Sequence, residues 1–150
     1  MSGSLPHNRL GPASYQVSAL VTGGMIVAAD SANATTVSAA TSASVTILGV
    51  AGNDAAPIPS QAGSTDTAAG GAPLVDISVL PDYVSVYRGA DMHVTYSANC
   101  AFGQQLMVSA TAGQVTPFTG TTYSQVIGRC TQPGGVVFAT NPVGRALIYG

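Results

Sequence analysis

The residues that could perform chemistry in this chain are few and widely spaced. His7 and His93 are the only histidines, Cys100 and Cys130 are the only cysteines, and glutamate is absent. No zinc or calcium ligand spacing occurs, and no phosphate-binding loop or nucleophile elbow joins a strand to a helix. The sequence therefore predicts no catalytic residue, no metal site and no cofactor, and we expect the chain not to be an enzyme.

The remaining polar groups favour structural roles. His93 alternates with apolar neighbours in a strand-like run, so we expect a surface imidazole or one whose hydrogen bonds are satisfied. Asp30, Asp54 and Asp82 adjoin turn-like residues, where a carboxylate commonly accepts hydrogen bonds from the turn. We expect the two cysteines to be free thiols packed as small hydrophobic groups, with a disulfide between them as the alternative.

The chain carries little charge. Charged residues are 7% of the sequence, where about 25% is usual, and lysine is absent. The four arginines are scattered along the whole length, so the clustered cations that bind phosphates are missing and nucleic acid is not an expected partner. A solution monomer normally has an intermixed charged exterior, so this composition indicates a protein that works packed against partners.

Neither a membrane span nor a secretion signal is visible in the sequence. The longest apolar run, residues 25–29, is far shorter than the roughly 18 residues that a span needs. The first twenty residues contain Pro6 and Pro12 and lack the apolar centre of a signal peptide. We therefore expect no membrane partner, and synthesis in a cytoplasm.

The apolar pattern predicts an all-β fold, a small β-barrel or sandwich. Val, Ile and Thr recur with the two-residue period of strands, with a short helix near residues 98–103 as the exception. Residues 1–15 are expected to form an extended N-terminal arm, because their prolines and glycine forbid a continuous helix. Residues 16–150 are expected to form a single β domain, with a Gly/Ala/Pro-rich loop insertion over residues 51–73.

The expected strands are separated by turn residues. Two pairs are expected to form hairpins, 83–87 with 92–96 and 105–110 with 114–118, because a short segment containing glycine joins each pair. The full set of expected strands covers residues 25–29, 35–38, 44–51, 74–79, 83–87, 92–96, 105–110, 114–118, 125–130, 136–139 and 145–149.

Two parts of the chain resemble each other. Residues 25–29 (MIVAA) align with 106–110 (LMVSA), and residues 47–51 (ILGVA) align with 126–130 (VIGRC) at a nearly equal offset. Each copy has a strand, a turn, a short strand, a loop and a strand that ends near a glycine. Two copies suit a barrel or sandwich built from two similar sheets and closed so that few edges are exposed. Chance similarity in a chain rich in Val, Ala and Gly is the alternative.

The order of motifs resembles a known family. An extended arm precedes Gly-Met-Ile-Val-Ala and Ile-Leu-Gly-Val-Ala, and after a variable segment come residues 103–117 (GQQLMVSATAGQVTP), 127–130 (IGRC) and 145–149 (RALIY). This order is similar to that of the small β-barrel decoration, or cement, proteins of tailed-phage capsids, over residues 20–50 and 83–150. The loop insertion and the Arg129-Cys130 pair depart from the family pattern.

The resemblance implies a structural virion protein without catalytic residues. Members of that family bind the outer surface of the expanded capsid, often as trimers, and clamp neighbouring major capsid protein subunits against internal pressure. The resemblance therefore implies the major capsid protein and further copies of this chain, as a homotrimer, as partners, and the outer capsid surface of the virion as the location. Candidate interface residues are Leu5, His7, Arg9 and Leu10 of the arm, together with Tyr15, Tyr83, Tyr87 and Tyr123, and with Tyr149 as a further anchor.

Two other classes of protein stay open. A different virion structural module, such as a head fibre, tail or fibre domain, would share the strand-rich, charge-poor sequence. A carbohydrate-binding β domain is the alternative from another class. It is less favoured, because tryptophan is absent and aromatic residues are only 6% of the chain, whereas sugars commonly stack on aromatic rings.

Overall fold

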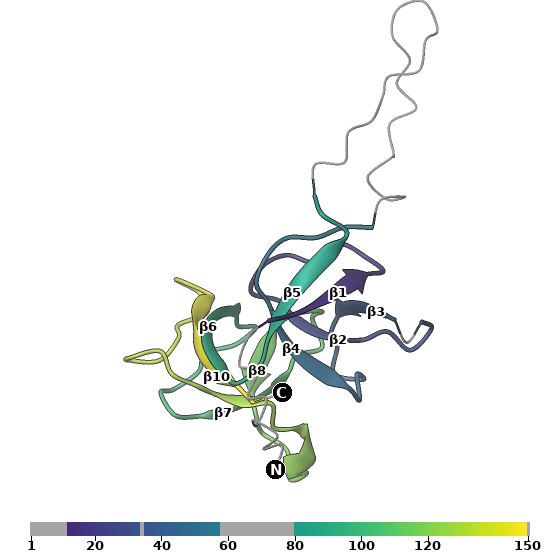
Figure 1. Ribbon diagram of the computed structural model, residues 1–150. Helices are drawn as coiled ribbons and strands as arrows, with labels where there is room; N and C mark the ends of the chain where they lie inside the picture. Colours follow the sequence, from purple (N-terminus) through teal and green to yellow (C-terminus); the bar gives the residue numbers. More distant parts are fainter. Residues whose placement is uncertain (1–11, 34, 58–79, 150) are drawn as a thin grey trace, which may run out of the picture.

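The computed structural model of the chain describes residues 12–33, 35–57 and 80–149, and these ranges are built mainly from β-strands (Figure 1). The helical structure in them is a single 3-10 turn, η1 (Tyr123–Gln125), and none of their helices is long and apolar enough to cross a membrane. The strands are β1 (Ala13–Val17), β2 (Ile26–Ala29), β3 (Thr36–Ala39), β4 (Ile47–Ala51), β5 (Tyr83–Tyr87), β6 (Ala90–Thr95), β7 (Gln105–Val108), β8 (Val115–Pro117), β9 (Gly128–Cys130) and β10 (Val143–Ile148). The expected all-β fold is confirmed.

The first five strands close into a barrel in the order β1-β3-β2-β4-β5. β1 pairs in parallel with β3 and antiparallel with β5, so it joins the two ends of the sheet. β2 lies between the antiparallel strands β3 and β4, and β4 pairs with β5. Closure removes the free edges that an open sheet would present to other chains.

The second five strands form a sheet in the order β6-β10-β9-β7-β8, and its ladders are antiparallel. One isolated parallel bridge, between Tyr96 and Val115, links the residue just after β6 to β8, so this sheet is nearly closed, and we call it the second barrel. Figure 1 shows this second barrel, mostly green to yellow, packed beside the purple to teal strands of the first.

The two barrels repeat one topology, with β1 to β5 corresponding in order to β6 to β10. Val27 pairs with Gly49 in the first barrel as Leu106 pairs with Gly128 in the second, and both residues are displaced by the same offset along the chain. The internal similarity expected from the sequence is therefore structural. The alignment of residues 25–29 with 106–110 is wrong by two positions, since the equivalent of Leu106 is Val27.

Individual hydrogen bonds repeat as well. The backbone N–H and the hydroxyl of Ser18 both donate to Val37 O, at 3.0 and 3.4 Å. The same two groups of Ser97 donate to Val115 O, at 2.9 and 3.3 Å. Because each pair of bonds requires one particular register between strands, the repeat extends to the parallel contact that closes each barrel.

Two apolar cores fill the molecule. The first lies inside the first barrel and includes Val17, Val27 and Val84. The second contains the interior of the second barrel together with Ile26 and Val50, which alternate with inward-facing residues on β2 and β4. The outer face of the first barrel is thus buried against the second barrel, and the shared core fixes the two barrels against each other.

Three local predictions are wrong. β5 and β6 do not form a hairpin, because β5 pairs with β1 and β4 whereas β6 pairs with β10, and Gly89 lies where the chain passes between the sheets. Residues 136–139 hold one bridge, from Val136 to Cys100, followed by a turn rather than a strand. Residues 98–103 form bends and a turn rather than a helix. The other expected hairpin, β7 with β8, is confirmed.

The expected segment boundaries also need correction. β1 begins at Ala13, so the arm cannot extend to residue 15. Ala51 ends β4, and Ala55 pairs with Val21 through two backbone hydrogen bonds of 2.8 Å, so the loop cannot begin at residue 51. Residues 1–11 of the arm, 58–73 of the expected loop and the expected strand 74–79 lie outside the described residues.

Candidate interaction surfaces

Several titratable side chains in the described ranges support local structure. No group of three or more His, Cys, Asp or Glu side chains lies together there. His93 is exposed on β6. Asp30 and Asp54 accept backbone N–H hydrogen bonds at 2.9 and 2.7 Å, and Asp82 accepts one from Gln16 Nε2 at 3.3 Å. These carboxylates therefore hold turns and strand ends, as the sequence predicts.

Cys100 and Cys130 are free thiols buried in the shared core. Burial, reinforced by the neighbouring Cys130, raises the pKa of the Cys100 thiol to about 12. Burial also raises the pKa of the Tyr96 hydroxyl, which donates a hydrogen bond to Arg145 O at 2.9 Å. Since a thiolate is the nucleophilic form of cysteine, Cys100 at neutral pH is a packing residue.

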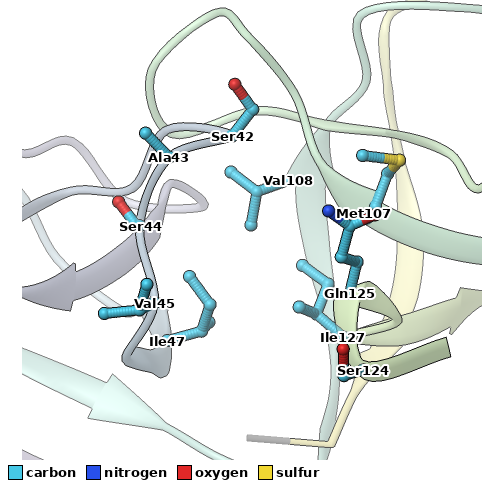
Figure 2. Close-up of a pocket in the computed structure, with 10 residues that line it drawn as sticks. All are labelled: Ser42, Ala43, Ser44, Val45, Ile47, Met107, Val108, Ser124, Gln125 and Ile127. Carbon is cyan, nitrogen blue, oxygen red and sulfur yellow. The ribbon is translucent and has the colours of Figure 1, made fainter. Parts of the chain in front are cut away.

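A groove lies between the two barrels (Figure 2). It encloses about 320 Å³, and a hollow of about 220 Å³ adjoins it, because Val45, Ile47, Ser124 and Ile127 line both. Figure 2 shows residues 42–45 and Ile47 on one wall, facing Met107, Ser124, Gln125 and Ile127 on the other. We call the two hollows together, with these walls and Tyr149, the inter-barrel groove.

The turn that precedes β4 presents Val45 to solvent at the rim of this groove. Thr41 N–H donates to Ser44 Oγ at 3.0 Å, and Ser44 N–H donates back to Thr41 O at 2.9 Å. This closed turn leaves Val45 98% exposed, while Ile47, the first residue of β4, is partly buried against the shared core. An exposed branched side chain next to an apolar hollow is typical of a contact surface.

Two tyrosines stand near the opposite wall of the groove. Tyr123 begins η1, is 72% exposed, and its ring centroid lies 5.7 Å from that of Phe118. Tyr149 lines the groove and is half-exposed, with its N–H donating to Ile127 O at 2.8 Å. A tyrosine offers an apolar ring and a polar tip, which is why the residue type is enriched at protein interfaces.

A second apolar surface lies in the connection between β9 and β10. Val137, Phe138 and Val143 are 56%, 45% and 43% exposed, respectively. Phe138 N–H donates to Asn99 Oδ1 at 2.8 Å, which ties the turn to the second barrel. Val137 and Val143 line one hollow of about 250 Å³. We call Val137, Phe138 and Val143 the loop-end patch.

The structure distributes the predicted interface tyrosines over both barrels. Tyr83 is exposed and Tyr87 half-buried on β5 of the first barrel, whereas Tyr123 lies on η1 beside the groove residue Ser124 (Figure 1). Tyr15 belongs to β1 and is partly buried against the first core, so its place in the arm is wrong. The predicted arm residues Leu5, His7, Arg9 and Leu10 lie outside the described residues.

Apart from Tyr149, the residues that shape the two surfaces were not predicted as interface residues from the sequence. Val45 falls inside the expected strand 44–51, whereas β4 starts only at Ile47. The signal that could have placed it is the run of small and polar residues before it, Thr-Ser-Ala-Ser at 41–44, which favours a turn. Val137 and Phe138 of the loop-end patch fall in the residues wrongly predicted as strand 136–139, and Val143 begins β10.

Comparisons with known proteins identify a similar fold. No protein-family model matches the chain, and no curated protein matches it. Among solved structures, the N base of head fiber gp8.5 in bacteriophage phi29 is similar, with a TM-score of 0.54 and 16% sequence identity. The match covers 91% of this chain and 92% of that chain, so it extends over both barrels and not over one alone. At this identity the likeness concerns the fold.

Proposed function

We propose that this chain is a structural protein of a phage virion and that it binds the outer surface of the capsid. The observation that carries the proposal is the match over 91% of this chain to the N base of a phage head fiber. The motif order, which resembles that of tailed-phage decoration proteins, supports the same location from the sequence. One line of support rests on backbone geometry and the other on short motifs.

The composition supports attachment through apolar area rather than charge. Charged residues are 7% of the chain, and the ion pair of Arg145 with Asp91 uses two of the few charges within the protein itself. The described surface instead offers exposed apolar side chains in the loop-end patch and at Tyr83. Binding through such groups would depend little on salt, because screening acts on charges.

In this proposal the protein stabilises the shell by bridging neighbouring major capsid protein subunits, as a homotrimer and without catalysis. Each contact can be weak, since three linked attachment points raise the overall affinity without new contacts. The loop-end patch and Tyr83 are the described candidates for these contacts. Leu5, His7, Arg9 and Leu10 stay predictions from the sequence.

A second virion role is favoured by one observation. A similar solved structure is the N base of a head fiber, and as a second proposal this chain is a capsid-bound base for a projecting structure. The two roles predict different consequences of removal. Shells that lack a cement protein lose resistance to heat or pressure, whereas shells that lack a fibre base keep it.

Binding to shells tests the proposal directly. Purified protein is expected to co-sediment with empty, expanded shells of the phage that encodes it, and to do so in high salt. The variant Val137→Asp/Phe138→Asp places charge on the loop-end patch and is expected to weaken binding by about tenfold or more, as loss of an apolar anchor commonly does.

The control places a single aspartate, half the charge added by the double variant, on an exposed residue of the first barrel. Leu20 is 57% exposed and belongs to neither surface defined above, so Leu20→Asp is expected to leave binding unchanged. Protein that stays in the supernatant with expanded shells contradicts the proposed attachment. A strict monomer in analytical ultracentrifugation contradicts the trimer, and a strong hit on a glycan array would favour the carbohydrate-binding alternative.

A further inference from the structure

The inter-barrel groove is lined without charged groups. Its walls carry the aliphatic side chains of Val45, Ile47 and Ile127, the Met107 thioether and several serine hydroxyls, and no described Asp, Arg or His lines it. Tyr149, also part of the lining, is half-exposed. A hollow of this chemistry fits an extended peptide segment with a few apolar side chains better than it fits an ionic ligand.

The first strand of the described chain begins beside the end of β5, which contacts β4 next to a groove residue. β1 starts at Ala13, which pairs with Val86 near the end of β5. Just beyond that end, Arg88 Nε donates to Leu48 O at 2.5 Å, and Leu48 follows the groove residue Ile47. The N-terminal segment therefore enters β1 close to one wall of the groove.

The end of β5 also contacts the chain next to the opposite wall of the groove, the wall that includes Tyr149. Gly89 N–H donates to Ile148 O at 2.8 Å, and Ile148 directly precedes the groove residue Tyr149. The end of β5, beside which β1 begins, thus contacts the chain on both sides of the groove. A segment that precedes Ala13 has only a short distance to cover before it reaches the hollow.

The residues that precede β1 have the composition that the groove fits. Eleven residues, 1–11, lie before the described chain, and Leu5 and Leu10 are the bulky aliphatic residues that follow the initial methionine. Arg9 is the one charged side chain among them. Extended, this segment spans at most about 40 Å, which is ample for a hollow next to its attachment point.

We propose that residues 1–11 of the same chain pack along the inter-barrel groove, with Leu5 and Leu10 covering Val45, Ile47 and Tyr149. A tethered segment is present at an effective concentration of about millimolar, so it competes well against the same segment of another molecule. This inference assigns the two leucines to the protein's own groove instead of to a neighbour. It does not depend on shell binding, so either proposal can fail without the other.

Methyl NMR of the full-length protein tests this packing. The variant Leu5→Asp/Leu10→Asp is expected to shift the methyl signals of Val45 and Ile47 and to remove nuclear Overhauser contacts between the leucine and groove methyl groups. The matched control, Ser2→Asp/Ser4→Asp, adds the same charge to polar positions of the same segment. It is expected to leave the groove signals and these contacts in place.

A second reference lies far from the groove. Val137 of the loop-end patch is expected to keep its methyl signals in both variants, which shows that the fold is intact. Groove signals that are identical in wild type and in Leu5→Asp/Leu10→Asp overturn the proposal. Contacts that appear only between differently labelled molecules in a mixed sample also overturn it, because the segment would then occupy the groove of another copy.

Discussion

Replacement of Gly128 by alanine is expected to weaken the second barrel strongly. Gly128 is buried on β9 and pairs with Ile148 of β10. A Cβ atom at this position would collide with the carbonyl oxygen of Leu147 and would lie 3.1 Å from Ile148 Cα and 2.9 Å from Ile148 Cδ1. The backbone φ of Gly128 is not positive, so the cost comes from this contact alone.

The magnitude follows from the atoms that obstruct the methyl group. Overpacking costs about 1–3 kcal/mol, and backbone atoms of β10 cannot rotate away as a flexible side chain would. Separation of β9 from β10 also weakens hydrogen bonds worth about 1 kcal/mol each. We therefore expect the free energy of unfolding to fall by about 3 kcal/mol and Tm to fall by about 6–12 °C. Gly49, the counterpart in the first barrel, faces Tyr87 O with φ at +147°, so Gly49→Ala should cost at least as much.

Urea denaturation followed by circular dichroism measures the effect. Gly23→Ala is the matched control, because a Cβ there would meet its nearest neighbours at 3.7 Å, and we expect a change within about 0.5 kcal/mol. A Gly128→Ala variant as stable as Gly23→Ala would refute the close approach of β9 to β10, and with it the register on which the repeat depends.

Three further predictions use the same assay. Because folded Cys100 keeps its proton up to a pKa of about 12 whereas an unfolded thiol loses it near 9.0, the contribution of Cys100 to stability should be constant below pH 9 and fall between pH 9 and 12; a contribution that rises there contradicts the burial of Cys100. Deletion of residues 1–11 should leave the circular dichroism spectrum unchanged, whereas deletion through Val17 removes β1 and should unfold the barrel; equal effects contradict its closing role. Asp91→Asn should cost less than about 1 kcal/mol, because its ion pair with Arg145 is partly exposed, and a larger loss contradicts this.

The sequence predicts strands better than it predicts their partners. The alternation in residues 83–87 is sufficient to place β5, because Val84 and Val86 point to one side and are buried. Pairing with residues 92–96 was inferred from closeness in the chain. Val94 of β6 belongs instead to the shared core, so β5 and β6 contribute to different cores. The sequence of these two strands alone does not predict which core each one joins.

The internal repeat gives a reference length for the connection in which the loop insertion was expected. The connection from β4 to β5 covers residues 52–82, whereas the equivalent connection from β9 to β10 covers only 131–142. The extra length coincides with the Gly/Ala/Pro-rich composition that suggested an insertion. Its start was misplaced, because the bridge of Ala55 to Val21 depends on a partner distant in sequence.

The candidate surfaces were less predictable, because exposure depends on tertiary packing. Val45 and Val50 are the same residue type five positions apart, yet Val45 is 98% exposed and Val50 is 1% exposed. The difference arises from the turn before β4 and from burial of β4 against the second barrel. Tyrosine enrichment at interfaces identified Tyr123 and Tyr149 near the groove, but it also selected Tyr15, which is partly buried in the first barrel.

Image reconstruction of intact virions is the most direct test of attachment to the capsid. The proposed function predicts two-barrel density on the outer surface of the shell, in contact with major capsid protein subunits and repeated around a threefold axis. Virions whose outer surface carries no such density, while the protein accumulates outside the particles, would contradict the proposed function.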